Sequence, residues 1–90
     1  MLTEKHRTPM TDLDRRAAEC LHGCVFVPGT ATKRFARDMA ALARSPDAAI
    51  TEAQRAYLFT ACHRFRRQIS DREILLLAEA YKDLPREVSA

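Results

Sequence analysis

Residues 51–70 read TEAQRAYLFTACHRFRRQIS, and this stretch decides the fold. It opens with Thr51 and Gln54 at the spacing of a capping box, in which each side chain satisfies a backbone N–H of the first helical turn. After the box, apolar residues recur every three or four positions, which is the period of one helix face. The residues of this face are Leu58, Ala61, Cys62, Phe65 and Ile69. The stretch therefore predicts a helix over roughly residues 52–69, with Phe65 in the core.

A second arc of the same predicted helix carries cations and one aromatic ring. Its residues are Arg55, Phe59, His63, Arg66 and Arg67. Because this arc is offset from the apolar one, we expect it to face solvent, with Phe59 at least partly exposed. Cations in a last turn also favour the negative end of the helix dipole, so a purely structural role for Arg66 and Arg67 stays open.

Three further segments show the helical period between start and stop signals. Residues 12–23 follow Thr11, with Asp14 in the first turn, residues 32–44 stop before Pro46, and residues 71–83 follow a capping box that begins at Ser70. The side chains expected to face the core are Leu13, Ala17, Cys20, Leu21 and Cys24 in the first segment, Phe35, Met39, Leu42 and Ala43 in the second, and Ile74, Leu77, Ala78 and Tyr81 in the third.

The connection at residues 25–29 is apolar and ends in Pro28 and Gly29, which stop a helix. We expect its apolar side chains to plug one end of the core. Strand-type alternation is absent, so the sequence predicts an all-α fold, a compact single-domain arrangement of about four short helices. The helical domain should span residues 11–84, between a flexible N-terminus at 1–10 and a frayed C-terminus at 85–90.

Length and composition narrow the classes of protein. The chain has 90 residues, enough for one small core, and no apolar run long enough to span a membrane. Residues 1–10 lack the apolar region of a signal peptide, and three cysteines are an odd number, so we expect free thiols and a cytoplasmic location. Two glycines are too few for a phosphate-cradling loop, and no carboxylates pair in an apolar context. We therefore predict no enzymatic activity and no cofactor.

The cysteines and histidines allow two interpretations. Cys20, His22, Cys24, Cys62 and His63 are ligand types that suit zinc. On helices, however, His22 points away from the neighbouring cysteines, and Cys62 and His63 diverge by about 100°. Cys20 and Cys62 also fall on the predicted core faces, where a free thiol behaves as a small apolar side chain. We expect core thiols and no metal ligands, and a zinc-dependent module remains the third alternative.

Basic residues are concentrated in two blocks, although the net charge is only +3. Residues 31–44 and residues 51–69 each hold four basic residues and one acidic residue. The first block places Lys33 and Arg34 at a helix start, where the dipole disfavours cations, so helix stability does not explain them. Arginine combined with aromatic rings suits phosphates and bases. The predicted binding residues are Lys33, Arg34, Arg37, Arg44, Arg55, Phe59, His63, Arg66 and Arg67.

Several stretches resemble a group of small uncharacterised helical proteins of proteobacterial chromosomes and their prophages. They are residues 25–29, Lys33-Arg34-Phe35, residues 50–58 and residues 63–69, and the resemblance covers roughly residues 13–80. The group has no assigned activity, so the resemblance brings no catalytic residues. It implies a phage or mobile-element setting, in which small helical proteins bind DNA or inhibit a host complex, as anti-CRISPR inhibitors do.

These observations together predict a non-enzymatic binding module. Its expected partner is nucleic acid, or a complex that handles nucleic acid, contacted through arginine-rich helix faces. The alternative is a phage-type inhibitor that binds an acidic protein surface directly. If neither interpretation holds, the cations are solvated or structural side chains without a binding partner.

Overall fold

The structure, a computed structural model, describes residues 6–82. Its elements are β1 (Arg7–Pro9), α1 (Asp12–His22), α2 (Ala31–Ala43), β2 (Ala49–Thr51), α3 (Glu52–Arg64), the short 3-10 helix η1 (Arg66–Gln68) and α4 (Arg72–Lys82). The helices match the four predicted segments, except that the expected helix over 52–69 ends at Arg64 and continues as η1. The predicted frayed segment 85–90 lies outside the described residues. No helix within residues 6–82 has both the length and the apolar character that crossing a bilayer requires.

Two capping boxes fix where α1 and α3 begin. At α1, the Thr11 hydroxyl accepts from the Asp14 N–H, and the Asp14 carboxylate accepts from the Thr11 N–H, both at 3.0 Å. At α3, Thr51 and Gln54 exchange the same two bonds at 3.0 and 2.8 Å. Each box satisfies two donors that the helix itself leaves without a partner. The predicted box at Thr51 and the predicted cap at Thr11 are therefore confirmed.

α2 begins one residue earlier than predicted, and the cap of α4 lies one residue later than predicted. The Thr30 hydroxyl accepts from the Lys33 N–H at 3.2 Å, so α2 begins at Ala31. The Asp71 carboxylate accepts from the Ile74 N–H at 3.3 Å, which makes Asp71 the cap of α4 in place of Ser70. An aspartate competes well for this position because its charge also favours the positive end of the helix.

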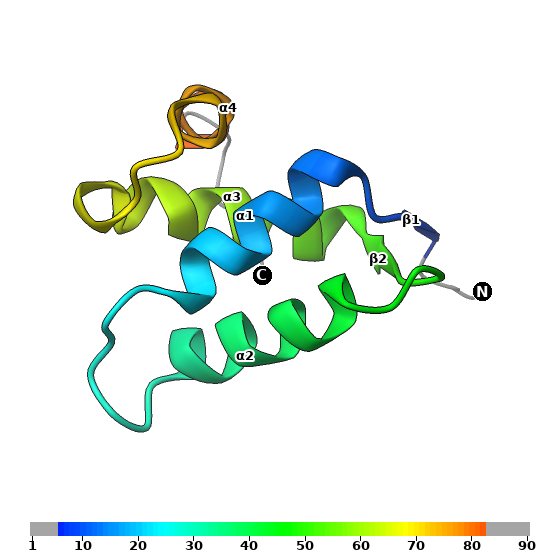
Figure 1. Ribbon diagram of the computed structural model, residues 1–90, viewed down its shortest axis with the longest axis horizontal. Coiled ribbons are helices and arrows are strands. Elements are labelled where there is room, and N and C mark those ends of the chain that lie inside the picture. Colours follow the sequence, from blue (N-terminus) through cyan, green and yellow to red (C-terminus); the bar gives the residue numbers. More distant parts are fainter. Residues whose placement is uncertain (1–5, 83–90) are drawn as a thin grey trace.

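The helices pack in the spatial order α2, α1, α3, α4 (Figure 1). α1 lies between α2 and α3 and contacts both, and α4 packs across α3. The connection between α1 and α2 lies at one end of the molecule, while β1 and β2 lie at the other (Figure 1).

A two-stranded antiparallel sheet was not predicted. β1 pairs with β2 so that Arg7 lies opposite Thr51 and Pro9 opposite Ala49. The Met10 N–H then donates to the Ala48 carbonyl at 3.0 Å, and the Met10 side chain is buried. Residues 7–10 of the segment expected to be flexible therefore take part in regular structure. The fold is mostly α with one small sheet, so the prediction of an all-α fold is correct except for this sheet. The sheet was missed because three-residue strands are too short to show an alternating pattern.

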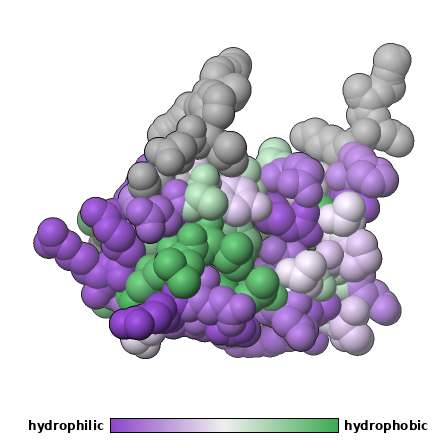
Figure 2. Space-filling view, turned by 90° about the horizontal axis from the view of Figure 1, so that it is seen from above, coloured by the Kyte–Doolittle hydropathy of each residue, from purple (hydrophilic) through white to green (hydrophobic). Residues whose placement is uncertain are grey.

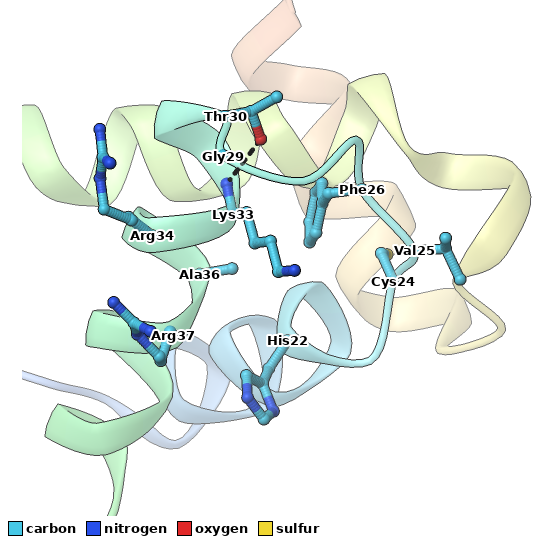
Figure 3. A pocket seen from close by; sticks show the side chains of 10 residues that line it. All are labelled: His22, Cys24, Val25, Phe26, Gly29, Thr30, Lys33, Arg34, Ala36 and Arg37. Atoms are coloured by element: carbon cyan, nitrogen blue, oxygen red, sulfur yellow. Dashed lines mark hydrogen bonds between the residues drawn. The ribbon is translucent and has the colours of Figure 1, made fainter.

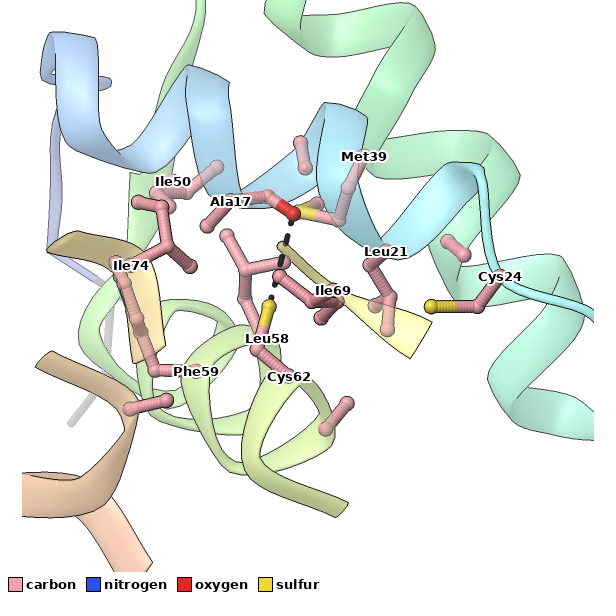
Figure 4. Close-up of a cluster of buried hydrophobic side chains, with 14 of the residues drawn as sticks. Ala17, Leu21, Cys24, Met39, Ile50, Leu58, Phe59, Cys62, Ile69 and Ile74 are labelled. Carbon is pink, nitrogen blue, oxygen red and sulfur yellow. Dashed lines mark hydrogen bonds between the residues drawn. The ribbon is translucent and has the colours of Figure 1, made fainter. Parts of the chain in front are cut away.

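The core forms where the inner faces of the four helices meet (Figure 4). Its largest side chains that solvent does not reach are Leu21, Met39, Ile50, Leu58 and Ile74, with the Cys62 thiol among them. The helix side chains predicted to face inward all belong to this cluster or pack against it. The periodicity of the apolar residues was therefore a reliable guide to the inner face of each helix.

The two phenylalanines of the α3 region differ from the prediction in how deeply they are buried. Phe59 is only 2% exposed and stacks on Tyr81 of α4, with ring centroids 5.1 Å apart. Phe65 is half-buried at the end of α3 and packs edge-on against Phe26 at 4.7 Å. The prediction that Phe59 is exposed is wrong because α3 is covered on two sides, by α1 and by α4, so both Leu58 and Phe59 are buried.

Candidate functional site

A recess of about 520 Å³ opens between the end of α1, the connection 23–30 and the first half of α2. Three predicted binding residues line it, Lys33, Arg34 and Arg37, and His22 of α1 joins them. Figure 3 shows the Lys33 amine pointing toward the space between Phe26 and His22. We call the four side chains His22, Lys33, Arg34 and Arg37 the basic recess. Each of them is exposed to solvent.

The electrostatic setting of the basic recess favours an anion. The first turn of α2 holds no acidic residue, although the positive end of a helix dipole normally favours one. Lys33 and Arg34 instead add positive charge there. Within residues 6–82, no carboxylate forms an ion pair with Lys33, Arg34 or Arg37. These three cations of the recess therefore have no paired counter-charge among residues 6–82.

The connection 23–30 forms one wall of the recess and is held in place by Gln68 of η1. The Val25 N–H donates to the Gln68 amide oxygen at 2.8 Å, and the Gln68 amide nitrogen donates to the Val25 carbonyl at 3.3 Å. Gly29 has a φ of +82°, which lets the chain turn into α2. Phe26 packs inward, but Val25 and Val27 are 78% and 71% exposed. The expectation that the valines plug the core is therefore wrong.

A second group of cations lies beyond the same wall. Arg64, Arg66 and Arg67 line a shallow recess of about 360 Å³ with Phe65 and Gln68. The Phe26–Phe65 contact and the Gln68 bonds to Val25 join this group to the connection that borders the basic recess. The predicted residues Arg66 and Arg67 thus lie next to the loop of the first recess. Arg66 also donates to the His63 carbonyl at 3.0 Å, which closes the end of α3.

Arg55 does not belong to an exposed binding face. Its side chain is 12% exposed and pairs with Asp14, whose side chain is 2% exposed, at 2.9 Å. Arg55 also donates to the Glu52 carboxylate at 2.5 Å and to the Thr8 hydroxyl at 3.0 Å, and these bonds tie α3 to α1 and β1. The hydrogen bonds to Asp14 raise the pKa of Arg55 further above its ordinary value. Arg55 was predicted to be a binding residue, but its guanidinium is engaged in contacts that hold the fold together.

The remaining predicted residues are dispersed. Arg44 is exposed but caps the far end of α2, away from the residues that line the basic recess. His63 is half-buried in the last turn of α3. Phe59 is buried, so its predicted stacking on bases cannot take place without unfolding part of the core. Of the predicted set, the structure brings together Lys33, Arg34 and Arg37.

Arg15 and Arg16, which were not predicted to bind, have structural partners. The Arg15 guanidinium donates to the carbonyls of Ala43 and Ser45 at 2.6 and 2.8 Å and so caps the C-terminal end of α2. Arg16 pairs with Asp71 at 2.8 Å and Glu73 at 2.9 Å, and the pair joins α1 to α4. The cations of the basic recess have no such bonds among the described residues, and they share this with other exposed arginines, such as Arg7 and Arg44.

Sequence reasoning missed His22 and the exposed valines as parts of this surface. His22 was weighed only as a zinc ligand, and its place at the end of α1 becomes informative once α2 is known to lie beside it. The valines carry no sequence signal of exposure, because an apolar loop normally packs inward. The Gln68 bonds that hold the loop outward join residues 43 positions apart.

The cysteines lie in or against the core. The thiols of Cys24 and Cys62 are buried and Cys20 is half-buried, and all three are free. The Cys62 thiol donates to the Ala17 carbonyl at 3.6 Å (Figure 4). Among residues 6–82, no three or more histidine, cysteine, aspartate or glutamate side chains lie close enough together to hold a metal ion. The described part of the chain therefore gives the zinc alternative no support.

Cys62 should be unreactive in the folded protein. Burial raises the pKa of its thiol from an ordinary value of 9.0 to about 12, so almost no thiolate is present at pH 8. In a Cys20→Ser, Cys24→Ser variant, we expect a chromogenic disulfide reagent to label Cys62 only after denaturant is added. Because the folded protein favours the neutral thiol, Cys62 adds to the free energy of unfolding. This contribution is fully present below about pH 9 and is lost as the pH rises toward 12. Labelling at the rate of an unfolded thiol under native conditions would contradict this description of the core.

Comparisons with family models, with curated proteins and with solved structures found no match to this chain. The candidate site therefore rests on the geometry and charge of the basic recess alone.

Proposed function

We propose that this chain is a small non-enzymatic binding module that contacts nucleic acid, or a complex that handles nucleic acid, through the basic recess. The observation that carries the proposal is the cluster of Lys33, Arg34 and Arg37 at the start of α2. None of the three cations has an ion pair within residues 6–82. Lys33 and Arg34 also lie in the first turn of α2, where the helix dipole disfavours cations, so these two cost the fold stability unless an anion binds. A phosphate backbone supplies closely spaced anions of this kind.

The arrangement suits phosphate contacts better than base stacking. Arg34 and Arg37 lie three residues apart and Lys33 and Arg37 four apart, so their side chains leave neighbouring positions of one helix face. Arginine binds phosphate oxygens through two parallel N–H donors, and lysine acts as a point charge. Phe59, the aromatic ring proposed from the sequence for stacking, is buried. We therefore propose backbone recognition with little dependence on base sequence.

A salt titration tests the proposal. The logarithm of the affinity for a labelled DNA duplex should fall linearly with the logarithm of salt concentration, with a slope of about 0.9 per phosphate neutralised. Replacing Arg34 or Arg37 by alanine should lower that slope by about one unit, because one phosphate contact is lost, without lowering the melting temperature. Fluorescence anisotropy between about 50 and 300 mM salt measures both quantities.

Arg7→Ala is the matched control, because it removes an equal charge at the opposite end of the molecule, on β1 (Figure 1). We expect it to leave the slope unchanged. Equal loss of slope in the Arg7 and Arg34 variants would mean that net charge, and not the basic recess, attracts the nucleic acid. Undetectable binding to duplex and single strands at about 50 mM salt would reject the nucleic-acid partner.

A phage-type inhibitor that binds a protein remains the second candidate, and a separate observation favours it. Val25 and Val27 are the two most exposed large apolar side chains among the described residues, and Val25 borders the basic recess. Apolar side chains beside arginine form the buried centre of many protein interfaces. A Val25→Ser, Val27→Ser variant separates the two candidates. It should leave nucleic-acid affinity unchanged, whereas affinity for a protein partner should fall at least tenfold, which is about 1.4 kcal/mol.

A further inference from the structure

A second surface lies on α4, away from the basic recess. α4 is uppermost in Figure 1, and Figure 2, which views the molecule from above, shows hydrophobic surface in the middle of that face with hydrophilic side chains around it. Leu76 is 66% exposed, and its neighbours Leu75 and Leu77 are only half-buried. Ile74 and Ala78 of the same helix are fully buried. α4 therefore has one apolar face against the core and a leucine at the centre of its outer face.

The charges around Leu76 have opposite signs on its two sides. Arg72 lies four residues before Leu76 and Glu79 three residues after it, so all three share the outer face of α4. Arg72 and Glu79 are exposed, and neither forms an ion pair within residues 6–82. Glu73, on the other flank of the helix, is already paired with Arg16. The outer face thus reads basic, apolar, acidic along the helix.

Such a pattern is complementary to itself when the second helix runs in the opposite direction. A two-fold axis perpendicular to α4 at Leu76 keeps each side chain on its own flank and reverses its position along the helix. Leu76 then lies against Leu76 of the second copy, and each Arg72 lies against the Glu79 of the other copy. On the opposite flank Glu73 meets Ala80, whose short side chain lets the helices approach. Parallel pairing would instead bring opposite flanks together, so that Glu79 would meet Ala80 of the second copy and would not reach Arg72.

We infer that α4 is a homotypic interface, through which two copies of this chain associate with their α4 helices antiparallel. The inference is independent of nucleic-acid binding, because it uses none of the residues of the basic recess. One pair of 11-residue helices is smaller than the interface of a tight dimer. The association should therefore be reversible and visible only at high protein concentration, in the range of about 0.1–1 mM.

A charge exchange tests the inference on the full chain. Arg72→Glu places acids at both ends of the outer face, and Glu79→Arg places bases at both ends. Either variant alone should repel its own copies, so sedimentation velocity should show its dimerisation constant weakened at least about tenfold. An equimolar mixture of the two variants should associate at least as strongly as the unaltered chain, because each acid then meets a base. The double variant Arg72→Glu, Glu79→Arg should also recover the original association.

Leu76→Glu tests the apolar centre, and it should abolish association while the circular dichroism spectrum and melting temperature stay unchanged. Arg44→Glu, a reversal on α2, is the matched control and should associate as the unaltered chain does. A chain that stays monomeric at about 1 mM overturns the inference. Failure of the two single variants to associate when mixed also overturns it, because any dimer seen would then use another surface.

Discussion

Replacing Asp14 by alanine should lower the free energy of unfolding by about 3–5 kcal/mol. The change leaves the Arg55 guanidinium, only 12% exposed, without its main counter-charge. It also removes the carboxylate that accepts from the Thr11 N–H, so α1 loses half of its capping box. Equilibrium unfolding in urea, followed by circular dichroism, measures the loss.

The exposed ion pair of Arg16 provides the control for this prediction. Arg16→Ala removes contacts to Asp71 and Glu73 that are exposed to solvent, and it should cost much less than Asp14→Ala. Adding Arg55→Met to the Asp14→Ala variant should recover part of the loss, because no buried charge is then left alone. Equal, small costs for Asp14→Ala and Arg16→Ala would show that the Asp14–Arg55 pair is not isolated from water.

Replacing Phe59 by alanine should cost about 3–5 kcal/mol, which is the usual range for a buried aromatic side chain. Phe59 is 2% exposed and stacks on Tyr81, so the change opens a cavity between α3 and α4. Phe65→Ala should cost at least about 1 kcal/mol less, because Phe65 is half-buried and water can reach the space it leaves. The same urea experiment measures both variants. A larger cost at Phe65 than at Phe59 would mean that Phe65, and not Phe59, is the more deeply buried ring.

The helix starts were predictable because their signals are local. Thr11 with Asp14 and Thr51 with Gln54 bond across three residues, so the sequence shows the complete motif. The inner helix faces were predictable for a related reason, since apolar residues at the helical period need only a core on one side. Leu58 was assigned correctly by this rule.

Phe59 and Arg55 were misassigned because their surroundings come from distant parts of the chain. The rule of one apolar face fails for α3, which is covered by α1 and by α4. A residue 100° away from Leu58 is then buried as well. Arg55 looked like part of a basic stripe, but Asp14, 41 residues earlier, lies against it. The pairing of β1 with β2 was missed for the same reason, because neither three-residue strand carries a pattern of its own.

The candidate site was predictable in part. The position of Lys33 and Arg34 at a helix start, against the dipole, pointed to a role outside the fold. That argument needs only the helix boundary, which the sequence supplied. Which other cations join them depends on tertiary structure: His22 joins them because α1 ends beside α2, and Arg44 does not because it lies at the other end of α2.

Titration of the isotope-labelled protein with a short DNA duplex, followed amide by amide in NMR spectra, tests the central claim most directly. The proposal predicts the largest shifts at residues 30–37 and at His22, with smaller shifts at residues 66–68 and little change on β1. It also predicts that about 0.3 M salt reverses the shifts, because phosphate contacts depend on counterion release. Shifts centred on another surface, or no shifts at low salt, would contradict the assignment of the basic recess as the nucleic-acid site.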